Sequence, residues 1–222
     1  MKTGIIFDMD GTLWDSAKEV ALSWNQVIVK KGMKPLTKQD LARVMGLPMD
    51  KLARALFPQL EAQASYDLMD ACVRVENDYL EIHGASLYAG VEETLRALGH
   101  TYPLYIVSNC QCGYIEAFLA HYHFGGLFAD FQCYGNNQKQ KGENIRIVAE
   151  RNALERVIYV GDIEGDYHAT VEAGGQFVHA AYGFGTLLEE IAKNVPAIRK
   201  FCELPAVVEQ ICKESSDVMR MR

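Results

Sequence analysis

The second half of the chain alternates short apolar runs with amphipathic segments, and this pattern limits the fold more than any other feature. It predicts strands at residues 101–107, 131–134, 157–160 and 176–180. It predicts helices at residues 91–98, 114–122, 143–151 and 186–192, with a short one around Val171. Strands that alternate with helices pair in parallel, and helices cover both faces of the sheet. We therefore expect an α/β fold with a doubly wound parallel sheet, a Rossmann-like core.

The first strand of this sheet lies at the N-terminus, far from the others in sequence. Residues 4–8 read GIIFD, a short apolar run that ends in an acid. From residue 16 to residue 84 the apolar positions follow helical spacing, with no convincing strand. We therefore expect an α/β catalytic core of residues 1–15 and 85–222, with an inserted helical cap at residues 16–84.

Local signals add detail to the helical elements. Ser16 and Glu19 have the spacing of a capping box at the start of the first cap helix. Pro48 suits the first turn of a later cap helix. The polar tail from Ser215 to Arg222 is expected to fray.

Net charge and composition argue against several classes of partner. The 222-residue chain carries a formal net charge of −7, which disfavours nucleic acid and anionic membrane surfaces. No apolar run approaches the roughly 20 residues that span a bilayer, and no secretory signal is visible. The six cysteines are therefore expected to be reduced thiols. We expect a cytoplasmic protein, a monomer or weak homodimer.

Acidic and polar residues follow three of the predicted strands. Asp8 and Asp10 end the first strand, Ser108 and Asn109 follow the second, and Asp162 with Asp166 follows a third. In a parallel sheet the carboxyl ends of the strands meet at one edge, where ligands bind. Four aspartates gathered there would repel one another unless a cation lay among them. Oxygen ligands favour Mg²⁺, and Lys141 would add a second positive charge, a combination that suits a phosphoryl group.

This set of residues resembles the haloacid dehalogenase superfamily of phosphohydrolases. All four motifs of the family occur in order: DMDGTL at residues 8–13, Ser108 at the end of an apolar strand, a lysine before a helix, and GDIEGD at residues 161–166. The resemblance covers about residues 1–190 in layout. The position of the helical insert resembles the first (type 1) cap class, found in phosphoglycolate-phosphatase-like and phosphomutase-like members.

The resemblance implies a role for each acid. Asp8 would attack phosphorus and form an aspartyl-phosphate, and Asp10 would protonate the leaving oxygen and then activate water. The metal ligands would be Asp8, Asp162 and the backbone carbonyl of Asp10. Asp166 would hold the metal site indirectly or through a water.

The same resemblance implies a phosphate-binding set. Ser108 and the amide of Asn109 would bind phosphate oxygens, and Gly11 would let the backbone approach the phosphate. The catalytic lysine is expected at Lys141, which directly precedes a helix. Lys139 remains the alternative, because the segment lacks the Lys-Pro pair that is frequent in the family.

The expected function is Mg²⁺-dependent hydrolysis of a small phosphorylated metabolite, either phosphoglycolate-like or sugar-phosphate-like. An aspartate at position 10 argues against dehalogenase-like, phosphonatase-like and ion-pump-like branches. A hexose-phosphate phosphomutase and a non-catalytic binding module remain alternatives.

Two further features have open interpretations. Cys110 and Cys112 favour packing roles over metal binding, although a helix N-terminus beside Cys110 could lower its pKa and make it sensitive to oxidation. The apolar residues around Gly46 belong either to the cap core or to a loop over the active site that touches substrate.

Overall fold

The computed structural model describes residues 1–47 and 49–220, and its centre is a six-stranded sheet. The strand order is β5-β4-β1-β6-β7-β8, and every neighbouring pair is parallel. The strands are β1 Thr3–Phe7, β4 Leu104–Ser108, β5 Phe128–Cys133, β6 Arg156–Gly161, β7 Gln176–Ala180 and β8 Ala197–Ile198. The predicted parallel α/β sheet is therefore confirmed.

Helices cover both faces of the sheet, and β1 contributes to both. Ile5 and Phe7 pack into one apolar core, whereas Ile6 points into the other, as the two-residue period of a strand requires. The first core includes side chains of α5 Val91–Gly99, α6 Tyr114–His121, the 3₁₀ turn η2 Phe201–Glu203 and α11 Leu204–Arg220. The second includes those of α8 Lys141–Arg151 and α9 Glu164–Glu172. Two short helices, α7 Tyr134–Asn137 and α10 Glu189–Ala192, lie in the loops after β5 and β7.

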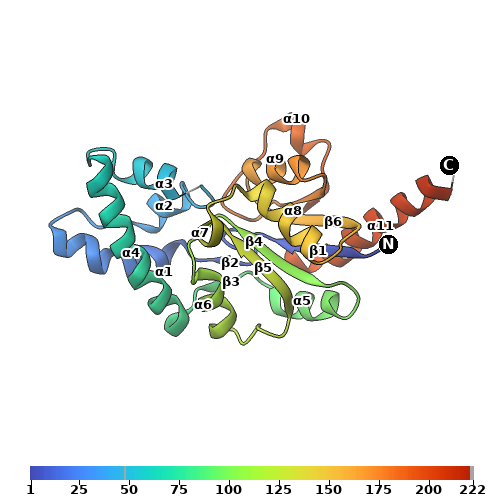
Figure 1. Cartoon of the computed structure of the whole chain (residues 1–222), viewed down its shortest axis with the longest axis horizontal. Coiled ribbons are helices and arrows are strands. Elements are labelled where there is room, and N and C mark those ends of the chain that lie inside the picture. The colour runs from blue at the N-terminus through green and yellow to red at the C-terminus, as the bar shows by residue number, and fades with distance from the viewer. Residues whose placement is uncertain (48, 221–222) are drawn as a thin grey trace.

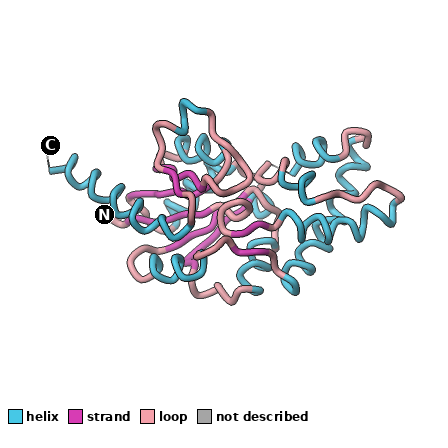
Figure 2. The backbone as a smooth tube through the Cα atoms, turned by 180° about the vertical axis from the view of Figure 1, so that it is seen from behind, coloured by secondary structure: helices cyan, strands magenta, loops and turns pink. Residues whose placement is uncertain are grey.

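A group of helices lies between the two strands of a small antiparallel pair. Strands β2 Trp14–Asp15 and β3 Ser86–Leu87 pair with each other, so the chain enters and leaves this group side by side. The group comprises α1 Ala17–Ile28, η1 Val29–Lys31, α2 Lys38–Ala42, α3 Met49–Leu56 and α4 Ala62–His83. Figures 1 and 2 show it at one end of the molecule, beyond the carboxyl ends of the sheet strands, with α1 packed along α4.

Some predicted boundaries differ from the structure. Strand β5 begins at Phe128 rather than residue 131, because Asp130 inside the strand is paired with Arg151 and Asn152 and interrupts the apolar pattern. Strand β4 begins after Pro103, which has no N–H to donate to a ladder.

The C-terminal segment contains elements that the sequence pattern did not predict. Helix α11 follows β8 and η2, and it buries Leu204, Val208 and Ile211 against the first core. The tail expected to fray continues this helix as far as Arg220, while Met221 and Arg222 lie outside the described residues. Pro48 also lies outside them, so its predicted place in a first helical turn is untested. Within the described part of the chain, no helix has the length and apolar character needed to cross a bilayer.

Candidate active site

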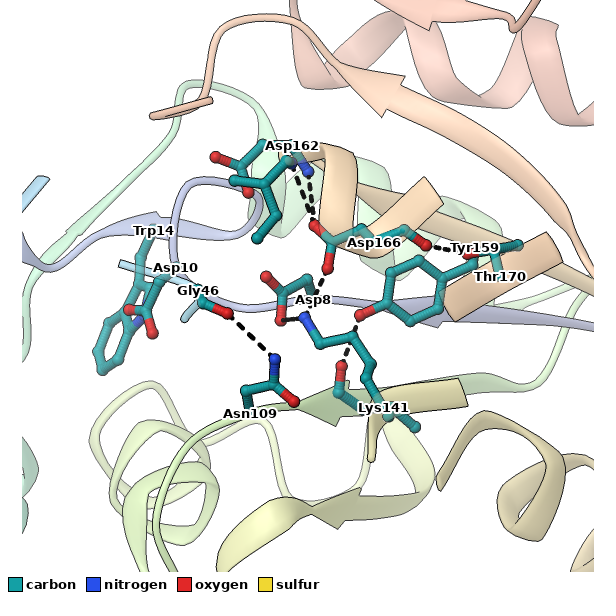
Figure 3. Close-up of polar contacts among 12 residues, drawn as sticks. Asp8, Asp10, Trp14, Gly46, Asn109, Lys141, Tyr159, Asp162, Asp166 and Thr170 are labelled. Carbon is teal, nitrogen blue, oxygen red and sulfur yellow. Dashed lines mark hydrogen bonds and ion pairs between the residues drawn. The ribbon is translucent and has the colours of Figure 1, made fainter. Parts of the chain in front are cut away.

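The carboxyl ends of the central strands gather three buried aspartates. Asp8 follows β1, and Asp162 and Asp166 follow β6, its neighbour in the sheet. One carboxylate oxygen from each lies within 4.8 Å of the others, and all three side chains are buried. Figure 3 shows Asp8 and Asp166 on either side of the ammonium group of Lys141. Residues 154 positions apart, Asp8 and Asp162, thus form one acidic site.

Lys141 is the cation at the centre of this site. It begins α8, and its Nζ lies 3.0 Å from Asp8 Oδ1 and 2.5 Å from Asp166 Oδ1. Burial opposes the charged ammonium, but the two carboxylates outweigh burial and raise the pKa of Lys141. The alternative, Lys139, is exposed and forms a 3.7 Å ion pair with Glu143. Of the two lysines, Lys141 is the one that reaches Asp8.

Asp8 is almost fully buried, at 1% exposure. Burial raises its pKa to about 6, while Lys141 lowers that pKa and Asp166 raises it. Apart from the Lys141 ammonium, neither of its carboxylate oxygens has a hydrogen-bond partner. A buried carboxylate in this condition is unfavourable unless a further cation or a hydrogen-bond donor compensates it.

Asp162 presents one oxygen to the same space. Its Oδ2 accepts hydrogen bonds from the backbone N–H groups of Phe184 (2.7 Å) and Gly185 (3.2 Å). Its Oδ1 is buried with no partner, and burial, Asp166 and Asp8 raise its pKa well above the ordinary range. The unpartnered oxygens of Asp8 and Asp162 are therefore a donor set that fits a hard cation.

Asp166 has a different place in the cluster, because both of its oxygens are occupied. Its Oδ1 accepts from Lys141, and its Oδ2 accepts from the backbone N–H groups of Asp162 (3.1 Å) and Ile163 (3.2 Å). These bonds orient Lys141 and the loop that carries Asp162. They fit the supporting role that the sequence motif implies for Asp166 better than direct metal ligation.

Gly11 makes close contact between the first loop and Asp162 possible. It has φ +82°, and a Cβ atom at this position would lie 2.1 Å from Asp162 Oδ2. Only glycine adopts this backbone conformation without strain and leaves that space free.

The carboxylate of Asp10 is held apart from the Asp8–Lys141 pair. Its Oδ1 accepts hydrogen bonds from Trp14 Nε1 (3.0 Å), the Tyr114 hydroxyl (2.6 Å) and the Ser16 hydroxyl. Figure 3 shows it directed toward Trp14. Burial raises its pKa to about 6, against the lowering effect of its hydrogen-bond donors. An acid with a pKa near neutrality is suited to proton transfer.

The predicted capping box of Ser16 and Glu19 is wrong. Ser16 precedes α1, but its side chain makes no cap hydrogen bond. Its hydroxyl donates to Asp10 instead, because the buried carboxylate is the stronger acceptor.

The predicted phosphate-binding residues lie at the end of β4, next to β1. Ser108 is its last residue and is buried. The side-chain amide nitrogen of Asn109 (Nδ2) donates to the backbone carbonyl of Gly46 at 3.0 Å. A Cβ at Gly46 would lie 2.7 Å from Ile163, so the loop around Gly46 rests on the rim of the site.

The structure also answers the open question of the Cys110 thiol, which follows β4. The pKa of Cys110 is raised well above its usual value by burial and by neighbouring Cys133, so the expected lowering is wrong. The sequence analysis did not identify Trp24 and Glu76, which form a hydrogen bond with each other beside Asp10. The sequence does contain one indication of Glu76: it is an acid four residues after Cys72, on the apolar face of α4.

Comparison with known proteins places this geometry in context. The sequence model of the haloacid dehalogenase-like hydrolase family matches residues 5–180 of this chain. A phosphoglycolate phosphatase of Rhodobacter capsulatus is 29% identical over 217 residues, covering 94% of this chain and 98% of the relative. One from Photobacterium profundum is 27% identical over 220 residues, covering 94% and 96%.

Solved structures share the fold. A haloacid dehalogenase-like family hydrolase from Streptococcus pneumoniae aligns with TM-score 0.76 at 22% identity, covering 93% of this chain and 98% of the other. A predicted phosphoglycolate phosphatase from Haemophilus somnus aligns with TM-score 0.78 at 22% identity and the same coverage. At this level of identity the likeness concerns the fold alone.

Proposed function

The chain belongs to the haloacid dehalogenase-like hydrolases, and we propose that it hydrolyses a small phosphate monoester through an aspartyl-phosphate on Asp8. The observation that carries this proposal is the buried Asp8 carboxylate, held 3.0 Å from Lys141 and otherwise without a hydrogen-bond partner. The curated relatives named phosphoglycolate phosphatases support the phosphatase activity. The substrate is a small metabolite, phosphoglycolate-like or sugar-phosphate-like.

The chemistry divides among the chain's own residues. An oxygen of Asp8 attacks phosphorus, which splits hydrolysis into two easier steps. Asp10 donates a proton to the leaving oxygen and then accepts one from the attacking water. Lys141 balances the charge of Asp8 and of the phosphoryl oxygens, and Ser108 and Asn109 bind those oxygens from the end of β4.

We propose Mg²⁺ as the cofactor, held by Asp8, Asp162 and the backbone carbonyl of Asp10. When bound, Mg²⁺ would neutralise phosphoryl charge and orient the group for attack. The unpartnered oxygens of Asp8 and Asp162 support this choice, because hard divalent cations prefer oxygen ligands. Asp166 would hold the site without touching the metal.

The proposed domain division follows the same arrangement. Residues 16–84 would act as a cap over the core formed by residues 1–15 and 85–222, excluding bulk water from the phosphate during reaction. The proposal also takes the enzyme to be a cytoplasmic monomer or weak homodimer.

Phosphate release from a panel of phosphorylated metabolites tests the proposal. We expect activity with Mg²⁺, none in chelator, and a loss of several orders of magnitude in kcat for Asp8→Asn. The control is Asp78→Asn, an exposed acid on α4. Turnover unchanged in chelator, or more than about a tenth of the activity retained by Asp8→Asn, would contradict the assignment.

A further inference from the structure

A small cavity joins Asp10 to the cap helices. It has a volume of about 40 Å³, and its lining includes Asp10, Ser108 and Asn109 from the core and Trp24 and Glu76 from the cap. Neither Asp8 nor Lys141 lines it, so it lies beside the phosphate-binding cluster rather than within it. Because Asp10 faces this space, the group that leaves with the Asp10 proton would occupy it.

Among the described residues the cavity has acids but no cation. Asp10 and Glu76 are its carboxyl-bearing lining residues, and no lysine, arginine or histidine lines it. Glu76 is 3% exposed, and its Oε2 accepts a 2.5 Å hydrogen bond from Trp24 Nε1. A carboxylate on the substrate would therefore enter a buried space next to two acids with no opposite charge to offset its desolvation.

The neutral polar side chains of the cavity can both donate and accept hydrogen bonds. The side-chain nitrogen of Asn109 donates to the backbone carbonyl of Gly46, and the side-chain nitrogen of Gln111 donates to Asn77 Oδ1 at 3.1 Å. The atoms of these side chains left for a ligand are their carbonyl oxygens, which accept, and the second N–H of each amide. A hydroxyl group, which both donates and accepts, complements such a lining.

A larger cavity of about 460 Å³ adjoins the first and shares Met49, Asn109, Cys110 and Gln111 with it. Its lining includes Arg54, an exposed cation on α3. Arg54 does not line the small cavity beside Glu76.

We propose that Glu76, held in place by Trp24, selects the leaving group, and that it favours one carrying hydrogen-bond donors and no negative charge over a carboxylate. This inference rests on the proposed phosphatase function and chooses between its two substrate classes, against phosphoglycolate. The donor comes from a hydroxyl, as in a polyol phosphate, or from an ammonium, as in an amino-alcohol phosphate.

Three small substrates separate these possibilities in the full-length protein with Mg²⁺. They are glycerol 3-phosphate, phosphoethanolamine and 2-phosphoglycolate, compared by kcat/KM, with p-nitrophenyl phosphate as a general phosphatase substrate. We expect each donor-bearing substrate to exceed 2-phosphoglycolate by at least about tenfold. If 2-phosphoglycolate equals or exceeds both, with activity retained, the inference is wrong and the phosphatase function stands. If none of the four compounds releases phosphate, the proposed function itself is overturned, together with the inference.

The variant Glu76→Gln tests the residue rather than the cavity. It keeps the volume and the acceptor for Trp24 but removes the carboxyl group that can ionise opposite an ammonium group of the substrate. We expect the ratio of kcat/KM for phosphoethanolamine over 2-phosphoglycolate to fall at least about fivefold, whereas Asp78→Asn, an exposed acid on the same helix, leaves it unchanged. A residue that only supports the fold would lower both values together. An unchanged ratio in Glu76→Gln would overturn the assignment to Glu76. The assignment would also fall if Arg54→Gln lost more activity on 2-phosphoglycolate than on the other substrates.

Discussion

The hydroxyl of Tyr114 donates a 2.6 Å hydrogen bond to the carboxylate of Asp10, although 104 positions separate the two residues. Tyr114 begins α6 on the core, whereas Ser16, a second donor to the same oxygen, leads into the helices α1–α4. The proposed general acid is therefore held by groups from both sides of the site, and its orientation depends on their relative position.

Removal of the Tyr114 donor should change the pH dependence of catalysis. This bond stabilises the ionised form of Asp10 and lowers its pKa, so Tyr114→Phe raises that pKa. A general acid acts while protonated, and the alkaline limb of kcat should therefore move upward by about 0.5 to 1 pH unit, with a several-fold lower maximum. The measurement is kcat against pH. Tyr122→Phe is the matched control, because the Tyr122 hydroxyl bonds Ala85 and not Asp10. Superimposable profiles for wild type and Tyr114→Phe would contradict a positioning role.

Lys141→Met should destabilise the fold as well as stop turnover. The substitution leaves Asp8 and Asp166 as buried carboxylates without their shared cation. We expect the free energy of unfolding in chelator to fall by about 3–5 kcal/mol near neutral pH. The loss should be smaller in acid, where the Asp8 carboxylate, with a pKa of about 6, takes up a proton. Lys139→Met removes an exposed ion pair and should cost less than about 1 kcal/mol. Denaturant unfolding of both variants checks this, and equal losses would mean that Lys141 is not the central cation.

Gly11→Ala should weaken metal binding beyond the effect of backbone strain. The new Cβ would collide with Asp162 Oδ2 and displace the carboxylate whose other oxygen we propose as a ligand. We expect the Mg²⁺ concentration for half-maximal activity to rise by about 10- to 100-fold. Gly32→Ala is a matched control, since Gly32 has φ +73° but nothing within 4 Å of the added Cβ. Both variants should lose about 1–2 kcal/mol of stability from the left-handed conformation. Unchanged Mg²⁺ dependence in Gly11→Ala would contradict the proposed site.

Glu76→Gln should alter how stability varies with pH. Burial raises the pKa of Glu76 from 4.5 to about 8, so the native state retains a proton that the unfolded chain releases. The stability that this proton contributes is fully present below the unfolded pKa and is lost as pH rises through about 8.

Calorimetry in chelator measures this effect. Wild type and Glu76→Gln should have similar stability near about pH 5, and the variant should be more stable by on the order of 4 kcal/mol near about pH 9. Asp78→Asn, on the same helix but exposed, should follow wild type at both values. A constant difference between wild type and Glu76→Gln across this range would mean that Glu76 is ionised throughout in the native protein.

Local sequence patterns determined the architecture and the main acids of this protein. The apolar run before Asp8 and the run before Asp162 predict parallel strands, and parallel strands bring their carboxyl ends to one edge. The alternation of elements after residue 84 therefore implied a shared site before any contact was known. Burial periodicity and turn residues are local properties, which is why they were sufficient for the sheet.

The tertiary structure decided which groups form hydrogen bonds and ion pairs with these acids. Ser16 has the local spacing of a helix cap, but its hydroxyl donates to Asp10, which is the stronger acceptor. Lys139 and Lys141 are close in sequence, and only the packing of α8 against the sheet places Lys141 between two buried carboxylates. The hydrogen bond between Trp24 and Glu76 joins side chains 52 positions apart in the sequence. Such contacts leave no period in the sequence, because they depend on how helices and strands pack after each has formed.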